Sequence, residues 1–149
     1  MMVRLRDACR EDYEFLYDLL KSTMMHYYSE AFGDWDETLE RQYFDESFSR
    51  HKYQIIIYDN CDIGCISLTQ SNKALFINEL QIVPQYQNRS IGKQVMKSVI
   101  EDSNRLSVPI TLEVLKTNNR AEAFYSRLGF KRNGQTESHW LMYRGACGK

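Results

Sequence analysis

The spacing of apolar residues along the chain changes between helical and extended patterns, and the order of these patterns predicts the fold. Residues 3–6 are predicted to form a short strand and residues 9–24 a helix. The apolar positions of this helix stand at near-helical spacing: Tyr13, Leu16, Leu20 and Met24. A break is expected at 29–35, where Asp34, with Glu37 three residues later, is placed to cap a second helix that runs to about residue 50.

Three strands are predicted next, over residues 53–58, 63–69 and 75–83. They are rich in β-branched and aromatic residues, and short polar turns separate them, which is typical of a meander. Pro84 ends the third strand because proline has no N–H group to donate to the ladder.

The second half of the chain alternates between helices and strands. One helical stripe precedes a predicted strand at 110–115: Ile91, Val95, Met96, Val99 and Ile100. A second stripe follows that strand: Ala121, Phe124, Tyr125 and Leu128. Gly129 is placed to end the second helix in the left-handed conformation. Strands at 130–136 and 139–144 complete the pattern.

The resulting order of elements, β-α-α-β-β-β-α-β-α-β-β, predicts an α/β fold. We expect a single domain over residues 1–149, with a mixed, mostly antiparallel sheet of about seven strands and helices on both faces. The strand–helix–strand unit at 75–115 is expected to form a right-handed parallel crossover.

Composition excludes several classes of protein. The 149 residues carry a formal net charge of −1, whereas duplex-binding domains usually have a basic face, so nucleic acid is not expected as a partner. No run of about 18 apolar residues predicts a membrane span, and the charged N-terminal segment lacks the apolar core of a signal peptide. We therefore expect a cytoplasmic protein. Its four cysteines and three histidines are scattered, so reduced thiols and no metal site are expected.

The segment 82–93 is the first candidate for chemistry. It is a predicted strand that ends in a tight loop and feeds a helix N-terminus, where unpaired N–H groups and the helix dipole favour a phosphate. Gly92 permits close approach of an anion to the backbone, and Arg89 and Lys93 add positive charge. The alternative is an ordinary strand-to-helix loop in which Ser90 is the N-cap.

The segment 118–130 is the second candidate. Asn118 is placed to cap its helix, Ala121 permits close packing, and the Tyr125 hydroxyl needs a partner if it is buried. The alternative is a plain core helix in which Tyr125 is a packing residue.

Together, these segments resemble the signatures of the GNAT superfamily of N-acetyltransferases. The pyrophosphate signature of that family is Gln/Arg-x-x-Gly-x-Gly/Ala, and the chain reads Gln87-x-x-Ser90-x-Gly92. A later signature, Asn-x-x-Ala-x-x-Phe-Tyr-x-x-Leu-Gly-Phe, is matched at Asn118, Ala121, Phe124, Tyr125, Leu128, Gly129 and Phe130. The order of elements is also similar over nearly the whole chain. Ser90 stands where the family usually has glycine, so its backbone is expected to be strained if that position needs a positive φ.

The resemblance implies that acetyl-coenzyme A (acetyl-CoA) is the cosubstrate and that no metal takes part. It implies that the strands at 75–83 and 110–115 splay apart and open a ligand site. Main-chain groups of the first strand are expected to pair with the pantetheine arm, and the loop amides to meet the pyrophosphate. The residues implied in coenzyme binding are Gln81, Ile82, Val83, Gln87, Asn88, Arg89, Ser90, Ile91, Gly92, Lys93, Asn118 and Tyr125.

The implied reaction is direct attack of an amine on the thioester in a ternary complex. The resemblance assigns Tyr125 as the proton donor to the leaving thiolate and the main chain near Ile82 as the donor to the oxyanion. Glu79, on the strand before the loop, is the expected base, and Glu113 on the next strand is its competitor. The alternative for both is a surface or otherwise satisfied carboxylate.

Acceptor pockets of the family are usually built by the first two helices and the last hairpin. Acceptor contacts are therefore expected from Tyr28, Glu30, Trp35 and His139. Acids among aromatic side chains suit a cationic amine, although the same acids also favour a helix N-terminus. The expected acceptor is a small primary amine, and the expected protein is a monomer or homodimer. The alternatives are a peptide or protein amine as acceptor, or a non-catalytic CoA-binding sensor or interaction module.

Overall fold

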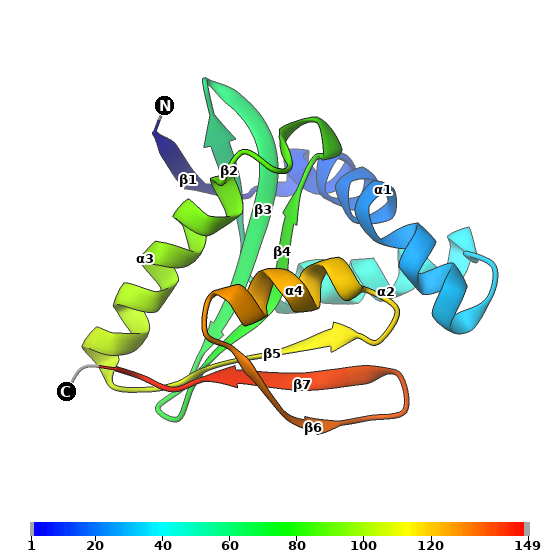
Figure 1. Ribbon diagram of the computed structural model, residues 1–149. Coiled ribbons are helices and arrows are strands. Elements are labelled where there is room, and N and C mark those ends of the chain that lie inside the picture. The colour runs from blue at the N-terminus through cyan, green and yellow to red at the C-terminus, as the bar shows by residue number, and fades with distance from the viewer. Residues whose placement is uncertain (1, 148–149) are drawn as a thin grey trace.

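A computed structural model describes residues 2–147 as one sheet with helices on both faces (Figure 1). Its strands are β1 (Val3–Asp7), β2 (Tyr53–Tyr58), β3 (Cys61–Gln70), β4 (Leu75–Ile82), β5 (Ile110–Leu115), β6 (Lys131–Gln135) and β7 (His139–Arg144). Its α-helices are α1 (Tyr13–Phe32), α2 (Glu37–Arg50), α3 (Ile91–Leu106) and α4 (Asn119–Arg127). Two short 3-10 turns precede α1 and α3, at Arg10–Asp12 and Pro84–Tyr86.

The strands form a single mixed sheet in the order β1-β2-β3-β4-β5-β7-β6. Neighbouring strands are antiparallel except β4 and β5, which are parallel. This parallel pair is joined only where Leu75 faces Ile110 and Phe76 faces Thr111, so its ladder ends after the second residue of each strand. The predicted sheet and the predicted splay are both confirmed. We call the opening between the remainders of β4 and β5 the wedge.

A β-bulge lies in β4 where the wedge begins. Ser67 of β3 pairs with Glu79 while Leu68 pairs with Ile77, so Asn78 is an extra residue in β4. A bulge bends its strand and increases the local twist. The second half of β4 therefore diverges from β5, and every side chain beyond Asn78 is shifted to the opposite face from the one that strict alternation would give.

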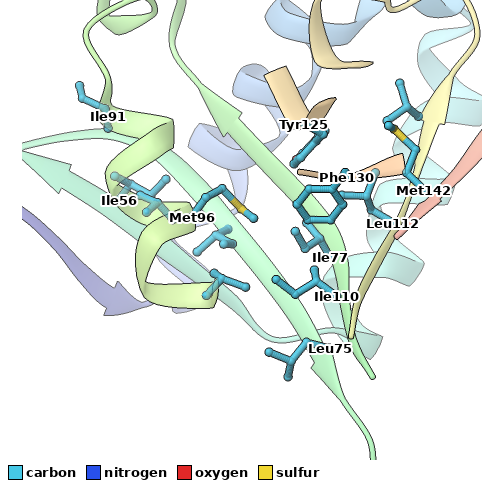
Figure 2. Packing of buried hydrophobic residues seen from close by; sticks show 14 of the residues in the cluster. Ile56, Leu75, Ile77, Ile91, Met96, Ile110, Leu112, Tyr125, Phe130 and Met142 are labelled. Atoms are coloured by element: carbon cyan, nitrogen blue, oxygen red, sulfur yellow. The ribbon is translucent and has the colours of Figure 1, made fainter. Parts of the chain in front are cut away.

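Two hydrophobic clusters hold the helices on opposite faces of the sheet. On one face, Met96 of α3 and Tyr125 of α4 belong to the same buried cluster as Ile77 of β4 (Figure 2). On the other face, Leu16 of α1 and Phe44 of α2 cluster with residues of β2 and β3. The two faces of the wedge are thus covered by different pairs of helices.

The first helix is longer than its sequence pattern predicts. α1 continues to Phe32, so the break expected at 29–35 is confined to the four residues between α1 and α2. A tertiary contact supports the added turns, because the Thr117 hydroxyl donates to the Tyr27 carbonyl over 2.8 Å. The helix ends at Gly33, whose φ of 95° is a glycine conformation.

The cap of the second helix also differs from the prediction. Asp36, not Asp34, is the N-cap, and its carboxylate accepts a hydrogen bond from the Leu39 amide over 3.0 Å. Glu37 is therefore the first helical residue and does not occupy a capping-box position.

The other predicted elements agree with the structure to within about two residues at each end, the usual spread of helix and strand boundaries. Gly129 ends α4 with a φ of 96°, and the Phe130 amide reaches back to the Tyr125 carbonyl over 3.1 Å, so the predicted left-handed cap is confirmed. Within residues 2–147, the structure has no helix of the length and apolar character needed to cross a bilayer.

Candidate active site

A cleft of about 680 Å³ opens at the wedge, on the side of α3 and α4. Its walls come from four segments of the chain: the end of β4, the loop that leads into α3, the inner face of α4, and α1 between Ser22 and Tyr27. The structure thus brings the two sequence signatures together at one cleft, which we call the first cavity.

The loop into α3 has a backbone suited to anions. Asn88 and Ser90 both adopt left-handed conformations, with φ of 63° and 64°. Turns of this kind direct successive N–H groups into a concavity, and the amides of Ile91, Gly92 and Lys93 have no intrahelical acceptor. Unpaired amides at a helix N-terminus, together with the helix dipole, favour the binding of an anion.

Ser90 occupies the N-cap position without acting as a cap. Its side chain makes no capping hydrogen bond, and its carbonyl accepts the first helical bond from Gln94 over 3.0 Å. A left-handed conformation costs a non-glycine residue about 1–2 kcal/mol. Serine is therefore strained at the position where the family signature usually has glycine.

Gly92 has a packing role beyond close approach to an anion. A Cβ atom at Gly92 would lie 3.2 Å from Cζ of Phe124, which is a tight contact. The absence of a side chain therefore allows the start of α3 to approach α4, and both helices line the first cavity.

Positive charge gathers along the first cavity. Lys93, Arg120 and Arg127 line it, and no aspartate or glutamate does among residues 2–147. Arg120 also donates to the Asn88 side-chain oxygen over 3.1 Å, which ties α4 to the loop. Arg89, which the sequence suggested for this role, instead stacks its guanidinium 4.9 Å from the Tyr86 ring centre and lies outside the lining. The sequence analysis did not predict Arg120 and Arg127 as lining residues, because helical periodicity does not show which end of α4 faces the loop into α3.

The main chain of β4 presents a restricted set of groups to the wedge. The Val83 amide is already paired with the Ile63 carbonyl over 2.8 Å, so it points toward β3. Backbone groups alternate along a strand, so those of Leu80 and Ile82 point toward the wedge, while those of Gln81 do not. The Ile82 carbonyl accepts from the Gln87 side chain over 2.9 Å, which leaves the Ile82 amide facing the cavity. Leu80 was not among the residues that the sequence suggested.

Asn118 and Tyr125 stand at the junction of the site. The Asn118 carboxamide oxygen accepts from the Ala121 amide over 3.0 Å, so it caps α4 as predicted. Tyr125 packs edge-on against Phe124 and Phe130, at ring-centre distances of 5.0 and 5.3 Å. Only 8% of Tyr125 is exposed, and its hydroxyl makes no hydrogen bond to any residue from 2 to 147. Burial raises the pKa of Tyr125, so it stays protonated at neutral pH.

A second cavity of about 300 Å³ lies on the other side of the wedge and shares Tyr125, Asn118 and Gln81 with the first. Glu79 lines it and accepts a hydrogen bond from the Gln81 side chain over 3.0 Å. Glu79 is partly accessible through the cavity but is otherwise surrounded by protein, and this burial raises its pKa to about 7, against the lowering effect of the Gln81 bond. Glu113 also lines the second cavity.

The suggested acceptor residues fall into two groups. Tyr28 and His139 line the second cavity, whereas Glu30 and Trp35 line neither cavity. Trp35 stacks on Tyr28 at 5.7 Å and donates to the Tyr17 hydroxyl over 3.3 Å, so it supports the cavity wall from behind. Glu30 is exposed on the surface of α1.

The acids near the start of α2 serve structure. Asp36 caps the helix, and Glu37 forms ion pairs with Lys21 at 2.8 Å and Arg41 at 3.4 Å. These contacts favour the interpretation in which Asp36 and Glu37 stabilise the N-terminus of α2 over the interpretation in which they attract a cationic amine.

Comparison with known proteins gives a family and a fold. The profile of the acetyltransferase (GNAT) family matches residues 14–130. No curated protein sequence matches the chain.

Solved structures of GNAT proteins are similar to this one over their whole length. PaiA N-acetyltransferase from Thermoplasma acidophilum, in complex with coenzyme A, is 20% identical with a TM-score of 0.77, covering 97% of this chain and 99% of its own. Ribosomal-protein-S18-alanine N-acetyltransferase from Escherichia coli is 17% identical with a TM-score of 0.69, covering 99% and 97%. A GNAT family acetyltransferase from Elizabethkingia anophelis with acetyl-CoA bound is 16% identical with a TM-score of 0.66, covering 96% and 97%. At these identities, the likeness establishes the fold.

Proposed function

The chain belongs to the acetyltransferase (GNAT) family, and from this premise we propose that it transfers the acetyl group of acetyl-CoA to the primary amine of a small molecule. Membership of the family makes it an acetyl-CoA-dependent N-acetyltransferase. The observation that carries the proposed acceptor is that two cavities of different size and charge meet at the wedge and share Tyr125.

The first cavity fits coenzyme A. The amides at the start of α3 take the pyrophosphate, and Lys93, Arg120 and Arg127 offset the charge of its phosphates. The amides of Leu80 and Ile82 pair with the pantetheine arm in the manner of an added strand. The thioester then lies at the junction of the cavities, beside Tyr125.

The chemistry assigned to the junction is acyl transfer without a covalent enzyme intermediate. Glu79 accepts the proton of the acceptor ammonium, and the neutral amine attacks the thioester carbonyl, forming a C–N bond. The C–S bond breaks, and Tyr125 gives its proton to the leaving thiolate. The nitrogen loses its second proton in this step, and this proton replaces the one on Tyr125 by way of solvent. A free amide on β4 near Ile82 stabilises the oxyanion that develops during the attack.

The size of the second cavity favours a small acceptor. Its volume of about 300 Å³ is at the lower end of the range for ligand sites. The fold alone does not distinguish a small-molecule acceptor from a protein acceptor, since the similar Escherichia coli enzyme is named for an alanine of a ribosomal protein. The small volume of the second cavity is what favours a small molecule over a peptide here.

The proposal is tested by release of free thiol from acetyl-CoA with a panel of small amines and short peptides. We expect amine-dependent thiol release with small amines and mass-spectrometric detection of the acetylated amine. Turnover of peptides alone would replace the small acceptor with a peptide amine. Thiol release that does not depend on any amine would contradict the proposed transfer.

A further inference from the structure

The two cavities at the wedge differ in charge. The first is lined by three cationic side chains, Lys93, Arg120 and Arg127, and by no carboxylate among residues 2–147. The second is lined by the two carboxylates Glu79 and Glu113 and, in the same described part of the chain, by no lysine or arginine. The proposed reaction requires only one carboxylate, so the second one has no role in the chemistry described above.

Glu113 faces the second cavity from the opposite strand. Leu112 and Val114 of β5 belong to the core under α3 and α4, so the alternation along β5 directs Glu113 to the face of α1 and α2. The bulge at Asn78 places Glu79 of β4 on that same face. The two carboxylates therefore flank one cavity from the two strands that part at the wedge.

Glu113 has no partner of its own. Glu113 is exposed, and its side chain makes no hydrogen bond or ion pair with any residue from 2 to 147, whereas Glu37 and Glu122 are both paired with cations. Tyr125, which is 8% exposed and whose hydroxyl is unpartnered within the described residues, also lines this cavity, so the two carboxylates lie beside the junction where the thioester is proposed to bind.

We propose that the acceptor carries a second cationic group, and that Glu113 binds this group while the reacting amine lies beside Glu79. The inference rests on the proposed function and names the class of its acceptor. The cavity then favours a short diamine over a monoamine of equal length. It disfavours an amino acid, because no lysine or arginine of the described residues lines the cavity to receive the carboxylate.

The test compares three acceptors with four-carbon chains: butylamine, 1,4-diaminobutane and 4-aminobutanoate. The far end of the molecule is neutral, cationic or anionic, and the reacting amine is the same. We expect kcat/KM for the diamine to exceed that for butylamine by about fivefold, beyond the factor of about two that two equivalent amines give, and 4-aminobutanoate to be the poorest. The series is repeated with 1,3-diaminopropane and 1,5-diaminopentane so that a mismatch of span is not mistaken for a lack of preference.

Two variants assign the preference to its residue. Glu113→Gln should lower kcat/KM for the best diamine by about fivefold and leave butylamine within about twofold. Glu101→Gln removes the same charge from the exposed side of α3, outside both cavities, and should leave both amines unchanged.

Butylamine turning over as fast as every diamine would overturn the inference while the proposed acetyl transfer stands. Equal loss with all acceptors in Glu113→Gln would also overturn it. Absence of turnover with every amine would instead refute the proposed function, so the two failures are distinguishable.

Discussion

The ionisation of Glu79 gives the sharpest test of the proposed chemistry. A base must be deprotonated to accept the proton of the acceptor, and burial raises the pKa of Glu79 to about 7. The ionised fraction of such a carboxyl rises from about 9% at pH 6 to about 91% at pH 8. The contribution of Glu79 to the rate should therefore rise about tenfold over this interval and then level off.

The acceptor amine also titrates, and its effect has to be removed. The neutral fraction of an alkylamine with a pKa near 10.4 falls about tenfold for each pH unit below that value, in the wild type and in a variant alike. The informative quantity is therefore the ratio of kcat/KM for wild type to that for Glu79→Gln, measured by thiol release from pH 5.5 to 9. We expect this ratio to rise about tenfold between pH 6 and 8 and to be constant above pH 8.

The free energy of unfolding at pH 8 is the control that tells whether Glu79→Gln is folded well enough for its activity to be compared with that of wild type. Folding raises the pKa of Glu79 from its ordinary value of 4.5 to about 7, so the folded protein holds this proton more tightly than the unfolded chain. The contribution of Glu79 to stability is thus lost as the pH rises from about 4.5 through about 7, and its ionised form is destabilising at pH 8. Glu79→Gln should be no less stable than wild type at pH 8. A ratio that stays flat from pH 6 to 8 in a folded variant would remove Glu79 as the base.

Two further substitutions test neighbouring steps. Tyr125→Phe retains the ring that packs against Phe124 and Phe130 and removes a hydroxyl that has no protein partner among the described residues. It should lower kcat by about 10- to 1,000-fold while calorimetry shows CoA affinity within about twofold, and an unchanged kcat would exclude Tyr125 as the donor. Ser90→Gly relieves the left-handed conformation at φ 64° and should raise the free energy of unfolding in urea by about 1 kcal/mol, whereas Ser90→Ala should not, because the hydroxyl makes no capping bond. Equal stability of the glycine variant and wild type would mean that Ser90 is not strained.

Most of the fold follows from local sequence patterns. The strand pairs and the two C-terminal helices are predicted because their apolar positions have clear periods and because Pro84, Gly129 and polar turns mark their ends. The first helix was predicted too short since its last turns depend on the contact of Thr117 with Tyr27, which are far apart in the sequence. A contact of this kind leaves no periodic signal.

The sequence motifs of the site could be predicted, but the faces of the sheet to which its side chains point could not. The signatures around Ser90 and Tyr125 predicted which segments meet, and the structure places both at the wedge. The bulge at Asn78 was not visible in the sequence, and it decides that Leu80 joins the core under α3 and α4 while Glu79 faces the second cavity. One inserted residue thus determines which side chains of β4 face α3 and α4 and which face α1 and α2.

The account depends most on the assignment of the α3 N-terminus as the pyrophosphate site. The direct measurement is a titration of ¹⁵N-labelled protein with coenzyme A, followed through backbone amide resonances. We expect the largest shifts at the amides of residues 88–93, with a second group at Leu80 and Ile82, and little change in β1 and β2 on the far edge of the sheet. Saturation with coenzyme A that leaves the resonances of 88–93 unmoved would contradict the account.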